Sequence, residues 1–297
     1  MSERITLQEI PLEELTIVPG SACQGCGPAL ASRLTFKVLG PNTIRHSVPC
    51  CPDAVTRTPG QGAEFEAGGN ALTGTWRALK AIGRTDINVV GFFGDGGTYD
   101  IGLQALSAAA ERNENVFVIC KDNEAYMNTG NQRSSSTPLY ALTTTTPLGI
   151  KSRGKDTPKK NVPMIFAAHG IPYVATTSIA FPTDLVAKVA YGKGIQGFKM
   201  LIIHAPCPTG WRFEPNMTIQ VARLAVQTGA FPLYEIINGQ KFKLNYKPKE
   251  LRPVGEYLKA QGRFRHMTDA ETGIVQQMTT SYWQKLLKMD EAGEVLF

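Results

Sequence analysis

Apolar and polar residues follow one another along the chain in a pattern that predicts strands and helices in turn. Short apolar runs rich in β-branched and aromatic residues indicate buried strands, whereas apolar residues three and four positions apart indicate amphipathic helices. The predicted strands are residues 43–48, 87–93, 115–121, 172–177 and 198–204. The predicted helices are residues 28–39, 68–82, 101–112, 164–169, 182–191 and 216–228. This alternation is typical of an α/β protein with a doubly wound, mostly parallel sheet.

The pattern changes after Phe231. Two short apolar runs on either side of Asn238-Gly239 predict a β-hairpin, and a helical segment follows them. We therefore expect a main domain over residues 1–231 and a C-terminal hairpin-helix extension over residues 232–297.

The predicted extension carries a group of large apolar residues. They are Tyr282, Trp283, Leu286 and Leu287. Aromatic and aliphatic anchors of this kind dominate protein–protein contacts. We expect the extension to help bind a partner subunit, and the alternative is that its helix packs on its own domain.

Composition narrows the class of protein. Of the 297 residues, 42% are apolar and 19% are charged, which fits a globular enzyme and excludes a disordered chain. The net charge is +6, but the basic residues are dispersed, so we do not expect a nucleic-acid-binding protein. The densest basic cluster, residues 151–160, is interpreted as a solvated loop or a dock for an acidic partner. With no apolar run of transmembrane length and no signal-like N-terminus, we expect a cytoplasmic protein without a membrane partner.

Six cysteines differ in their surroundings. Cys23 and Cys26 form a C-x-x-C pair in a glycine-rich turn, and Cys207 follows a predicted strand far downstream. Cys50 and Cys51 are adjacent, so either could be a ligand. Cys120 lies inside a predicted strand and is expected in the core. Four thiolates would suit an iron–sulfur cluster, and a four-cysteine zinc site is the alternative, although only one pair is close in sequence.

The sharpest signal follows two consecutive strands. Gly94-Asp95-Gly96-Gly97 comes directly after one predicted strand, and Asp122-Asn123 follows the next. Glycines let backbone N–H groups approach phosphate oxygens, and the following helix offers its N-terminus. Asp95, the Asn123 side-chain oxygen and a backbone carbonyl near Ala125 are suited to Mg²⁺. The pattern indicates a metal-bridged diphosphate site, and the alternative is a glycine-rich turn with an aspartate helix cap.

Three segments carry a resemblance to a known family. Residues 94–107, 122–138 and 257–264 resemble the β subunit of the pyruvate:ferredoxin oxidoreductase family of 2-oxoacid oxidoreductases, within a likeness from Ala22 to about Phe264. The resemblance implies a thiamine diphosphate-binding fold with Mg²⁺ and a [4Fe–4S] cluster. It implies that the cluster ligands are Cys23, Cys26, Cys51 and Cys207, and that Mg²⁺ is held by Asp95, Asn123 and the carbonyl of Ala125.

The resemblance also implies which residues line the cofactor. These are Pro28, Cys51, Gly94, Asp95, Gly96, Gly97, Asn123, Glu124, Ala125, Tyr126, Met127 and Asn128. Asn128 is expected to point toward the reacting carbon. The implied partners are an α-type subunit that completes the thiamine site, ferredoxin-like δ and γ subunits, and external ferredoxin.

The implied reaction is the oxidative decarboxylation of pyruvate to acetyl-CoA and CO₂, with coenzyme A as co-substrate. Residues 51–65 depart from the family because the segment is short and lacks a tryptophan, so the substrate is open. Oxalate, split to CO₂ without coenzyme A, is a rival substrate, and branched 2-oxoacids are a third. Two other classes remain as alternatives: a thiamine-dependent decarboxylase without electron transfer, and a structural subunit clipped by zinc.

Overall fold

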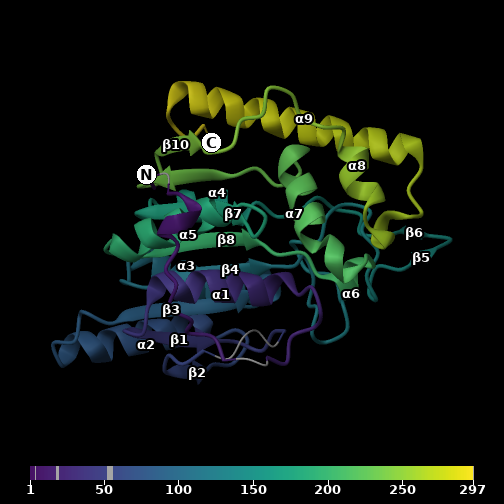
Figure 1. Ribbon diagram of the computed structural model, residues 1–297. Helices are drawn as coiled ribbons and strands as arrows, with labels where there is room; N and C mark the ends of the chain where they lie inside the picture. Colours follow the sequence, from purple (N-terminus) through teal and green to yellow (C-terminus); the bar gives the residue numbers. More distant parts are fainter. Residues whose placement is uncertain (4, 18–19, 52–55, 297) are drawn as a thin grey trace.

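The computed structural model describes residues 1–3, 5–17, 20–51 and 56–296. At its centre is an eight-stranded sheet with the strand order β10-β9-β7-β8-β4-β3-β1-β2 (Figure 1). The strands of this sheet are β1 (Thr43–Ser47), β2 (Gly60–Gly62), β3 (Asn88–Gly94), β4 (Phe117–Asp122), β7 (Tyr173–Ser178), β8 (Lys199–His204), β9 (Tyr234–Ile237) and β10 (Lys241–Leu244). A separate pair is formed by β5 (Leu148–Gly149) and β6 (Ser152–Arg153).

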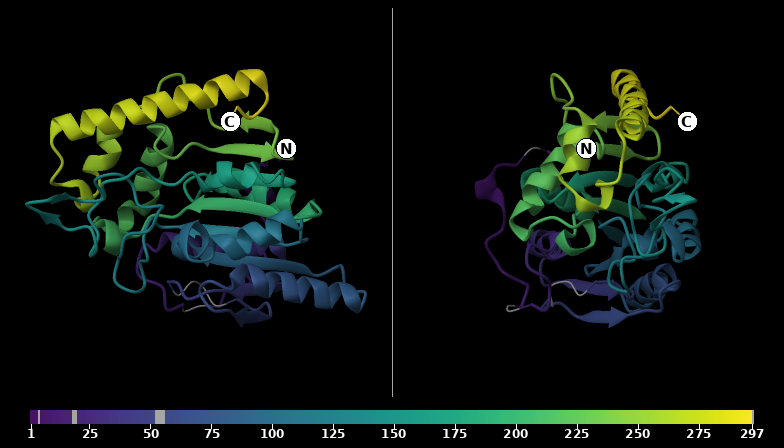
Figure 2. Two further views of the ribbon diagram at one scale, coloured as in Figure 1. Left: turned by 180° about the vertical axis from the view of Figure 1, so that it is seen from behind. Right: turned by 90° about the vertical axis from the view of Figure 1, so that its right-hand side faces the viewer.

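Helices cover both faces of the sheet, as the two views in Figure 2 show. They are α1 (Gly27–Leu39), α2 (Gly68–Ala81), α3 (Leu103–Glu111), α4 (Val162–Ala167), α5 (Pro182–Gly194), α6 (Pro208–Trp211), α7 (Thr218–Gln227), α8 (Val254–Lys259) and α9 (Asp269–Ala292). Short helical turns are η1 (Leu7–Glu9), η2 (Gly96–Asp100), η3 (Pro215–Met217) and η4 (Gly262–Phe264). The strands β2, β1, β3, β4, β8 and β7 are mutually parallel, and β9 and β10 are antiparallel additions.

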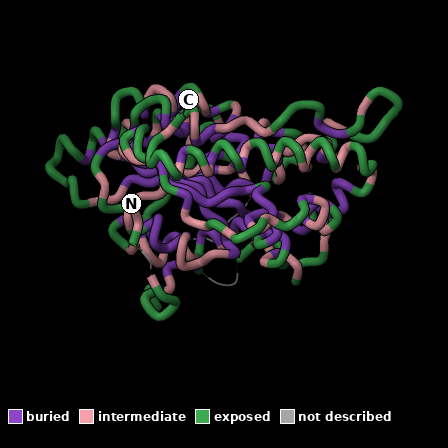
Figure 3. Tube along the Cα trace, turned by 90° about the horizontal axis from the view of Figure 1, so that it is seen from above, coloured by how far each residue is buried: buried purple, intermediate pink, exposed green. Residues whose placement is uncertain are grey.

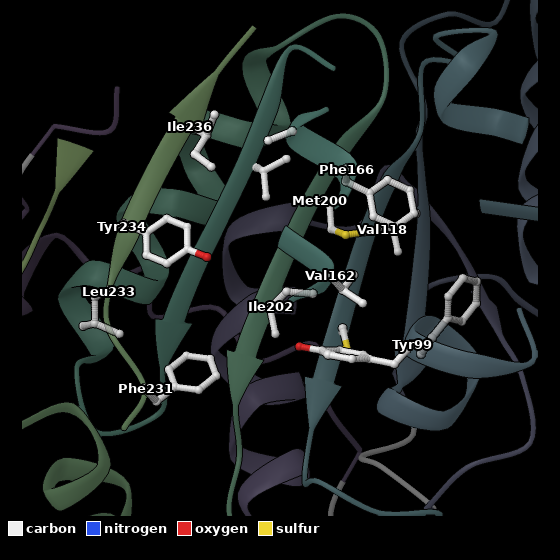
Figure 4. Close-up of a cluster of buried hydrophobic side chains, with 14 of the residues drawn as sticks. Tyr99, Val118, Val162, Phe166, Met200, Ile202, Phe231, Leu233, Tyr234 and Ile236 are labelled. Atoms are coloured by element: carbon white, nitrogen blue, oxygen red, sulfur yellow. The ribbon is translucent and has the colours of Figure 1, made fainter. Parts of the chain in front are cut away.

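Side chains that alternate between the two faces of the central strands build two hydrophobic cores, one on each face of the sheet. In β4, Val118 and Cys120 pack against the side covered by α2, α3 and α4, whereas Phe117 and Ile119 pack under α1 and α5. All six residues of β4 are buried, which a strand covered on both faces requires. Figure 3 shows the buried backbone in purple at the centre of the molecule. Figure 4 shows the first core between β4, β8 and β9, including Val118, Ile202 and Tyr234. The predicted doubly wound, mostly parallel α/β fold is confirmed.

The C-terminal hairpin extends the central sheet. The strand β9 is hydrogen-bonded to β7 with Tyr173 opposite Ile237, and β10 pairs with β9 at the edge. The helix α9 lies along this edge (Figure 1). The sheet thus continues across residue 231, and the division into two domains at that position stays a prediction.

Three apolar residues of α9 are buried against their own chain. Trp283 is 7% exposed and Leu286 is fully buried, and both belong to the first core together with Met289. The expectation that these anchors bind a partner subunit is therefore wrong for Trp283 and Leu286, because both side chains are already buried in the core that contains residues of β9 and β10. Tyr282 is also engaged, since its hydroxyl accepts a hydrogen bond from the Asn161 amide over 3.1 Å.

Candidate functional site

The glycine-rich turn lies at the carboxyl edge of the sheet, where β3 ends at Gly94. Asp95 already has helical backbone angles, and the wide helical turn η2 follows it before α3 begins. The chain therefore enters a helix directly after the strand, earlier than the sequence predicts. At Gly96 a Cβ atom would lie 2.4 Å from Cε1 of Tyr126, so a side chain there would displace this ring.

Three oxygens converge beside this turn. The side-chain oxygen of Asn123 faces Oδ1 of Asp95 and the carbonyl oxygen of Ala125, and both distances are 3.0 Å. All three residues are buried. Oxygens that face one another at this distance need either a proton or a cation between them, and rotating the amide of Asn123 would supply the proton. A carboxylate, an amide oxygen and a carbonyl are also the hard donors that Mg²⁺ takes, so the residues fit this ion.

The surroundings of Asp95 favour a bound cation. Burial, followed by the negative charge of Asp122, holds the pKa of Asp95 well above its usual range. The hydroxyl of Ser134 donates to Oδ2 of Asp95 over 2.5 Å and fixes the carboxylate from the side away from Asn123. A divalent cation next to Oδ1 would offset both the burial and the repulsion, because it is the largest local charge in such a site.

A small hollow of about 40 Å³ opens next to these oxygens. Of the residues expected to line the cofactor, the structure brings together Cys51, Gly94, Asp95, Gly96, Gly97, Asn123, Ala125, Tyr126, Met127 and Asn128. It adds four that were not among the residues expected to line the cofactor, namely Pro49, Cys50, Phe65 and Thr129. Phe65 packs against Tyr126 with ring centres 5.7 Å apart. Phe65 ends residues 51–65, the segment whose departure from the family leaves the substrate open.

Two expected residues lie elsewhere. Pro28 is buried at the first turn of α1 and does not line the hollow. Glu124, with φ of 61°, turns its side chain away from the hollow and lines a larger cavity of about 350 Å³ between the sheet and α8 and α9. Its contact with the cofactor therefore stays a prediction. Because the backbone at Glu124 is left-handed, its side chain lines a different cavity from its neighbours Asn123 and Ala125.

Glu124 is part of a buried ion network. Its carboxylate accepts from Lys159 over 3.1 Å and from Arg263 over 2.5 Å, and Lys159 also donates to Asp122 over 2.7 Å. Burial alone would raise the pKa of Glu124, but the charges of Lys159 and Arg263 outweigh it and hold the pKa at about 2. The Arg263 guanidinium lies 3.7 Å from the ring centre of Trp211, whose indole N–H donates to the carbonyl of Asn123 over 2.8 Å. The network thus supports the backbone that carries Asn123.

The basic cluster at residues 151–160 belongs to the same support. Lys155 is buried and donates to the carbonyls of Thr137 over 2.5 Å and Pro158 over 3.1 Å. Lys160 donates to the carboxylate of Asp100 over 3.3 Å. The interpretation of this cluster as a solvated loop or a dock for an acidic partner is wrong for Lys155 and Lys159. Lys155 donates hydrogen bonds to backbone carbonyls, and Lys159 donates to the carboxylates of Asp122 and Glu124.

The C-x-x-C turn is docked against the segment that carries Cys207. The N–H of Gly27 donates to the carbonyl of Pro206 over 3.2 Å, and the hydroxyl of Thr218 donates to the carbonyl of Gly25 over 2.7 Å. A Cβ atom at Gly27 would lie 2.5 Å from the Pro206 oxygen, which explains the need for glycine at this close approach.

The docked turn brings Cys23 and Cys26 near Cys207, and Cys51 lies close enough for their charges to shift its pKa. Burial raises the pKa of Cys26 and of Cys207, and it raises that of Cys51 to about 12. The thiols also raise one another's pKa values, Cys26 through Cys207 and Cys23, and Cys51 through Cys207 and Cys26. Such thiols would become thiolates only next to a strongly positive group, and an iron–sulfur cluster provides one.

The thiols adjoin the oxygen site. The amide nitrogen of Asn123 donates to Sγ of Cys51 over 3.8 Å, so one residue contacts both groups. Sγ of the neighbouring Cys50 accepts from Lys121 over 3.5 Å. Cys120 is fully buried in β4, as expected for a core residue. Among the residues that the structure describes, no three His, Cys, Asp or Glu side chains are arranged to hold a single metal ion.

The chain is similar to known proteins over most of its length. The family described as "Thiamine pyrophosphate enzyme, C-terminal TPP binding domain" matches residues 59–203. Pyruvate synthase subunit PorB of Methanothermobacter thermautotrophicus is 49% identical over 286 residues, covering 94% of this chain and 99% of that protein. Ketoisovalerate oxidoreductase subunit VorB of Pyrococcus abyssi is 44% identical and covers 98% of this chain and 97% of that one.

The chain belongs to the β subunits of the 2-oxoacid:ferredoxin oxidoreductases. Members of this family are oxidoreductase subunits that work in multi-subunit complexes, and the chain carries their thiamine pyrophosphate-binding domain. A solved 2-oxoglutarate:ferredoxin oxidoreductase from Magnetococcus marinus has the same fold, with a TM-score of 0.57, 20% identity and coverage of 75% of this chain and 84% of that one. None of the described helices is both long enough and apolar enough to span a membrane.

Proposed function

We propose that this β subunit holds thiamine pyrophosphate through Mg²⁺ at Asp95, Asn123 and Ala125, and a [4Fe–4S] cluster at Cys23, Cys26, Cys51 and Cys207. The observation that carries the proposal is the position of Asn123. Its oxygen faces Asp95 and Ala125 at 3.0 Å, while its amide nitrogen donates to Cys51 over 3.8 Å. A diphosphate-bound metal and an electron acceptor would therefore be neighbours in this subunit.

The chain's own residues would perform the binding and positioning. Thiamine pyrophosphate supplies an electron sink for decarboxylation of a 2-oxoacid, and a [4Fe–4S] cluster accepts electrons one at a time. Asp95 and Asn123 would anchor the metal-bound diphosphate. Asn128 is exposed at the hollow and would contact the reacting end of the substrate.

We propose pyruvate as the substrate, with coenzyme A accepting the acetyl group, CO₂ released and an electron pair passed to ferredoxin. The support is the likeness to pyruvate synthase subunits, which includes a second PorB from Methanocaldococcus jannaschii at 46% identity over 91% of this chain. The VorB relative supports 2-oxoisovalerate as the second candidate. Oxalate is the third.

We further propose that the subunit is active only in its complex, in the cytoplasm. The hollow of about 40 Å³ is far smaller than the roughly 300–1,000 Å³ of a typical cofactor pocket. An α-type subunit would supply the remaining surface. Ferredoxin-like δ and γ subunits and external ferredoxin would carry the electrons onward.

The test is anaerobic turnover of the purified complex with pyruvate, 2-oxoisovalerate or oxalate, with and without coenzyme A. We expect reduction of ferredoxin with pyruvate only when coenzyme A is present, and faster than with the other two acids. Reduction of ferredoxin with oxalate in the absence of coenzyme A would mean that the substrate is oxalate and not pyruvate. Decarboxylation without reduction of any electron acceptor, or zinc in place of iron, would contradict the proposed electron transfer.

A further inference from the structure

A short arm leaves the body of the protein at the carboxyl edge of the sheet. It comprises β5, β6 and the turn between them, residues 148–153, and it pairs with no strand of the central sheet. In Figures 1 and 2 it projects farther than any other segment on the side where α6 lies.

The tip of the arm is apolar. Ile150 is fully exposed, and Leu148 is 51% exposed. Single exposed apolar residues are common on protein surfaces. Here two of them share the end of one projecting hairpin, with the exposed Lys151 beside them.

The base of the arm is held firmly. Arg153 makes a two-pronged ion pair with Glu271 at the start of α9, over 2.8 and 2.7 Å, and donates to the carbonyl of His266 over 3.0 Å. Gly154 has φ of 88°, and a Cβ atom there would lie 2.3 Å from the Tyr140 carbonyl oxygen. A hairpin fixed in this way loses little conformational entropy when a partner binds its tip.

The arm is connected to the cofactor hollow by a short chain of hydrogen bonds. The backbones of Tyr126, which lines the hollow, and Gln132 bond to each other over 2.9 and 3.2 Å. The adjacent Asn131 carbonyl accepts from the N–H of Thr144 over 3.0 Å, four residues before the arm. The arm therefore emerges at the edge where the hollow of about 40 Å³ requires a second surface to enclose a cofactor.

We propose that the arm is a docking element for the subunit that closes the thiamine site. The proposal rests on the proposed function, which requires such a subunit at this edge. The partner surface that fits is an apolar pocket for Ile150 and Leu148 with acidic residues around it, because Lys151 and the chain's net charge of +6 favour a negative rim. Two exposed apolar side chains on a fixed hairpin would find their complement in such a pocket.

The experiment measures assembly. The complex is purified through a tag on the α-type subunit, and the retained amount of this chain is compared for wild type, Ile150→Asp and Leu148→Asp. The matched control is Ile82→Asp, since Ile82 is 72% exposed after α2 at the opposite edge of the sheet. Circular dichroism of each variant confirms its fold.

We expect at least tenfold less retention for Ile150→Asp and Leu148→Asp, and wild-type retention for Ile82→Asp. Wild-type assembly of both arm variants would overturn the proposal, as would an equal loss in the control. A loss of self-association with unchanged binding of the α-type subunit would assign the arm to a second copy of this chain instead. Assembly is read without reference to cofactor content, so a complex that assembles but holds no thiamine pyrophosphate would refute the proposed function alone.

Discussion

The hydroxyl of Ser134 donates to Oδ2 of Asp95 over 2.5 Å, whereas Oδ1 of Asp95 is the oxygen that faces the side-chain oxygen of Asn123. Ser134 belongs to the loop after the asparagine motif, 39 residues from Asp95. This hydrogen bond therefore joins the loop after Asn123 directly to the carboxylate of Asp95. Partners of this kind orient metal-binding carboxylates and set their affinity.

The first prediction concerns this hydroxyl. Ser134→Ala should weaken the affinity for Mg²⁺ and thiamine pyrophosphate roughly 10- to 100-fold, because the carboxylate loses the bond that orients it. Titration of the cofactor-free complex at several Mg²⁺ concentrations measures the effect. Ser135→Ala is the control, since Ser135 meets the neighbouring Asp100 through its backbone N–H, which the substitution keeps. Equal affinities in the two variants would remove Ser134 from the metal site.

The second prediction separates two cysteines. Cys207→Ser should yield a labile or missing [4Fe–4S] cluster, because serine oxygen is a poorer ligand for iron in such clusters than thiolate is. Cys120→Ser should keep its iron and lose only stability, since Cys120 is buried in β4. Iron analysis and electron paramagnetic resonance of the anaerobically purified complexes measure both. Full iron content in the Cys207 variant would move the ligand assignment to another cysteine, with Cys50 the first candidate.

The third prediction concerns Lys199 at the start of β8. Burial lowers the pKa of this lysine from 10.5 to about 7, although its ammonium donates to Asn115 over 2.7 Å. Between these two pKa values the unfolded chain binds more protons than the folded chain, so stability rises with pH there. Lys199→Met should stabilise the fold at pH 7 by up to about 4 kcal/mol, less the contribution of the lost hydrogen bond to Asn115, with a gain that shrinks toward pH 10. Thermal unfolding at several pH values checks the sign, and a gain that grows with pH would contradict it.

Periodicity predicted the fold because the central strands are buried on both faces. Residues 115–121 and 198–204 contain the apolar runs 116–120 and 200–203, and the structure places strands at Phe117–Asp122 and Lys199–His204. The hairpin was equally visible through Asn238-Gly239. Strands as short as Gly60–Gly62 carry too few residues for any periodicity to register, and this one was missed.

The site was only partly predictable, since sequence shows which residues are near a motif but not their directions. Asp95, Asn123 and the four cysteines follow strand ends or a glycine turn. Asp95 and Asn123 meet at 3.0 Å, and the cysteines lie close enough to affect one another's pKa values, but the ligand sets stay predictions. The direction of the Glu124 side chain could not be predicted, because its left-handed backbone turns it toward Lys159 and Arg263. Lys155 and Lys159 were misinterpreted because their partners, such as Asp122, lie in other parts of the sequence.

The central claim is that Asp95 anchors the metal-bound cofactor, and Asp95→Asn tests it most directly. This variant keeps the shape of the side chain and removes the charge that Mg²⁺ requires. The measurement is the dissociation constant of thiamine pyrophosphate for the assembled complex at saturating Mg²⁺. The account predicts at least a hundredfold weaker binding in Asp95→Asn, with unchanged assembly and iron content. Wild-type affinity in that variant would contradict it.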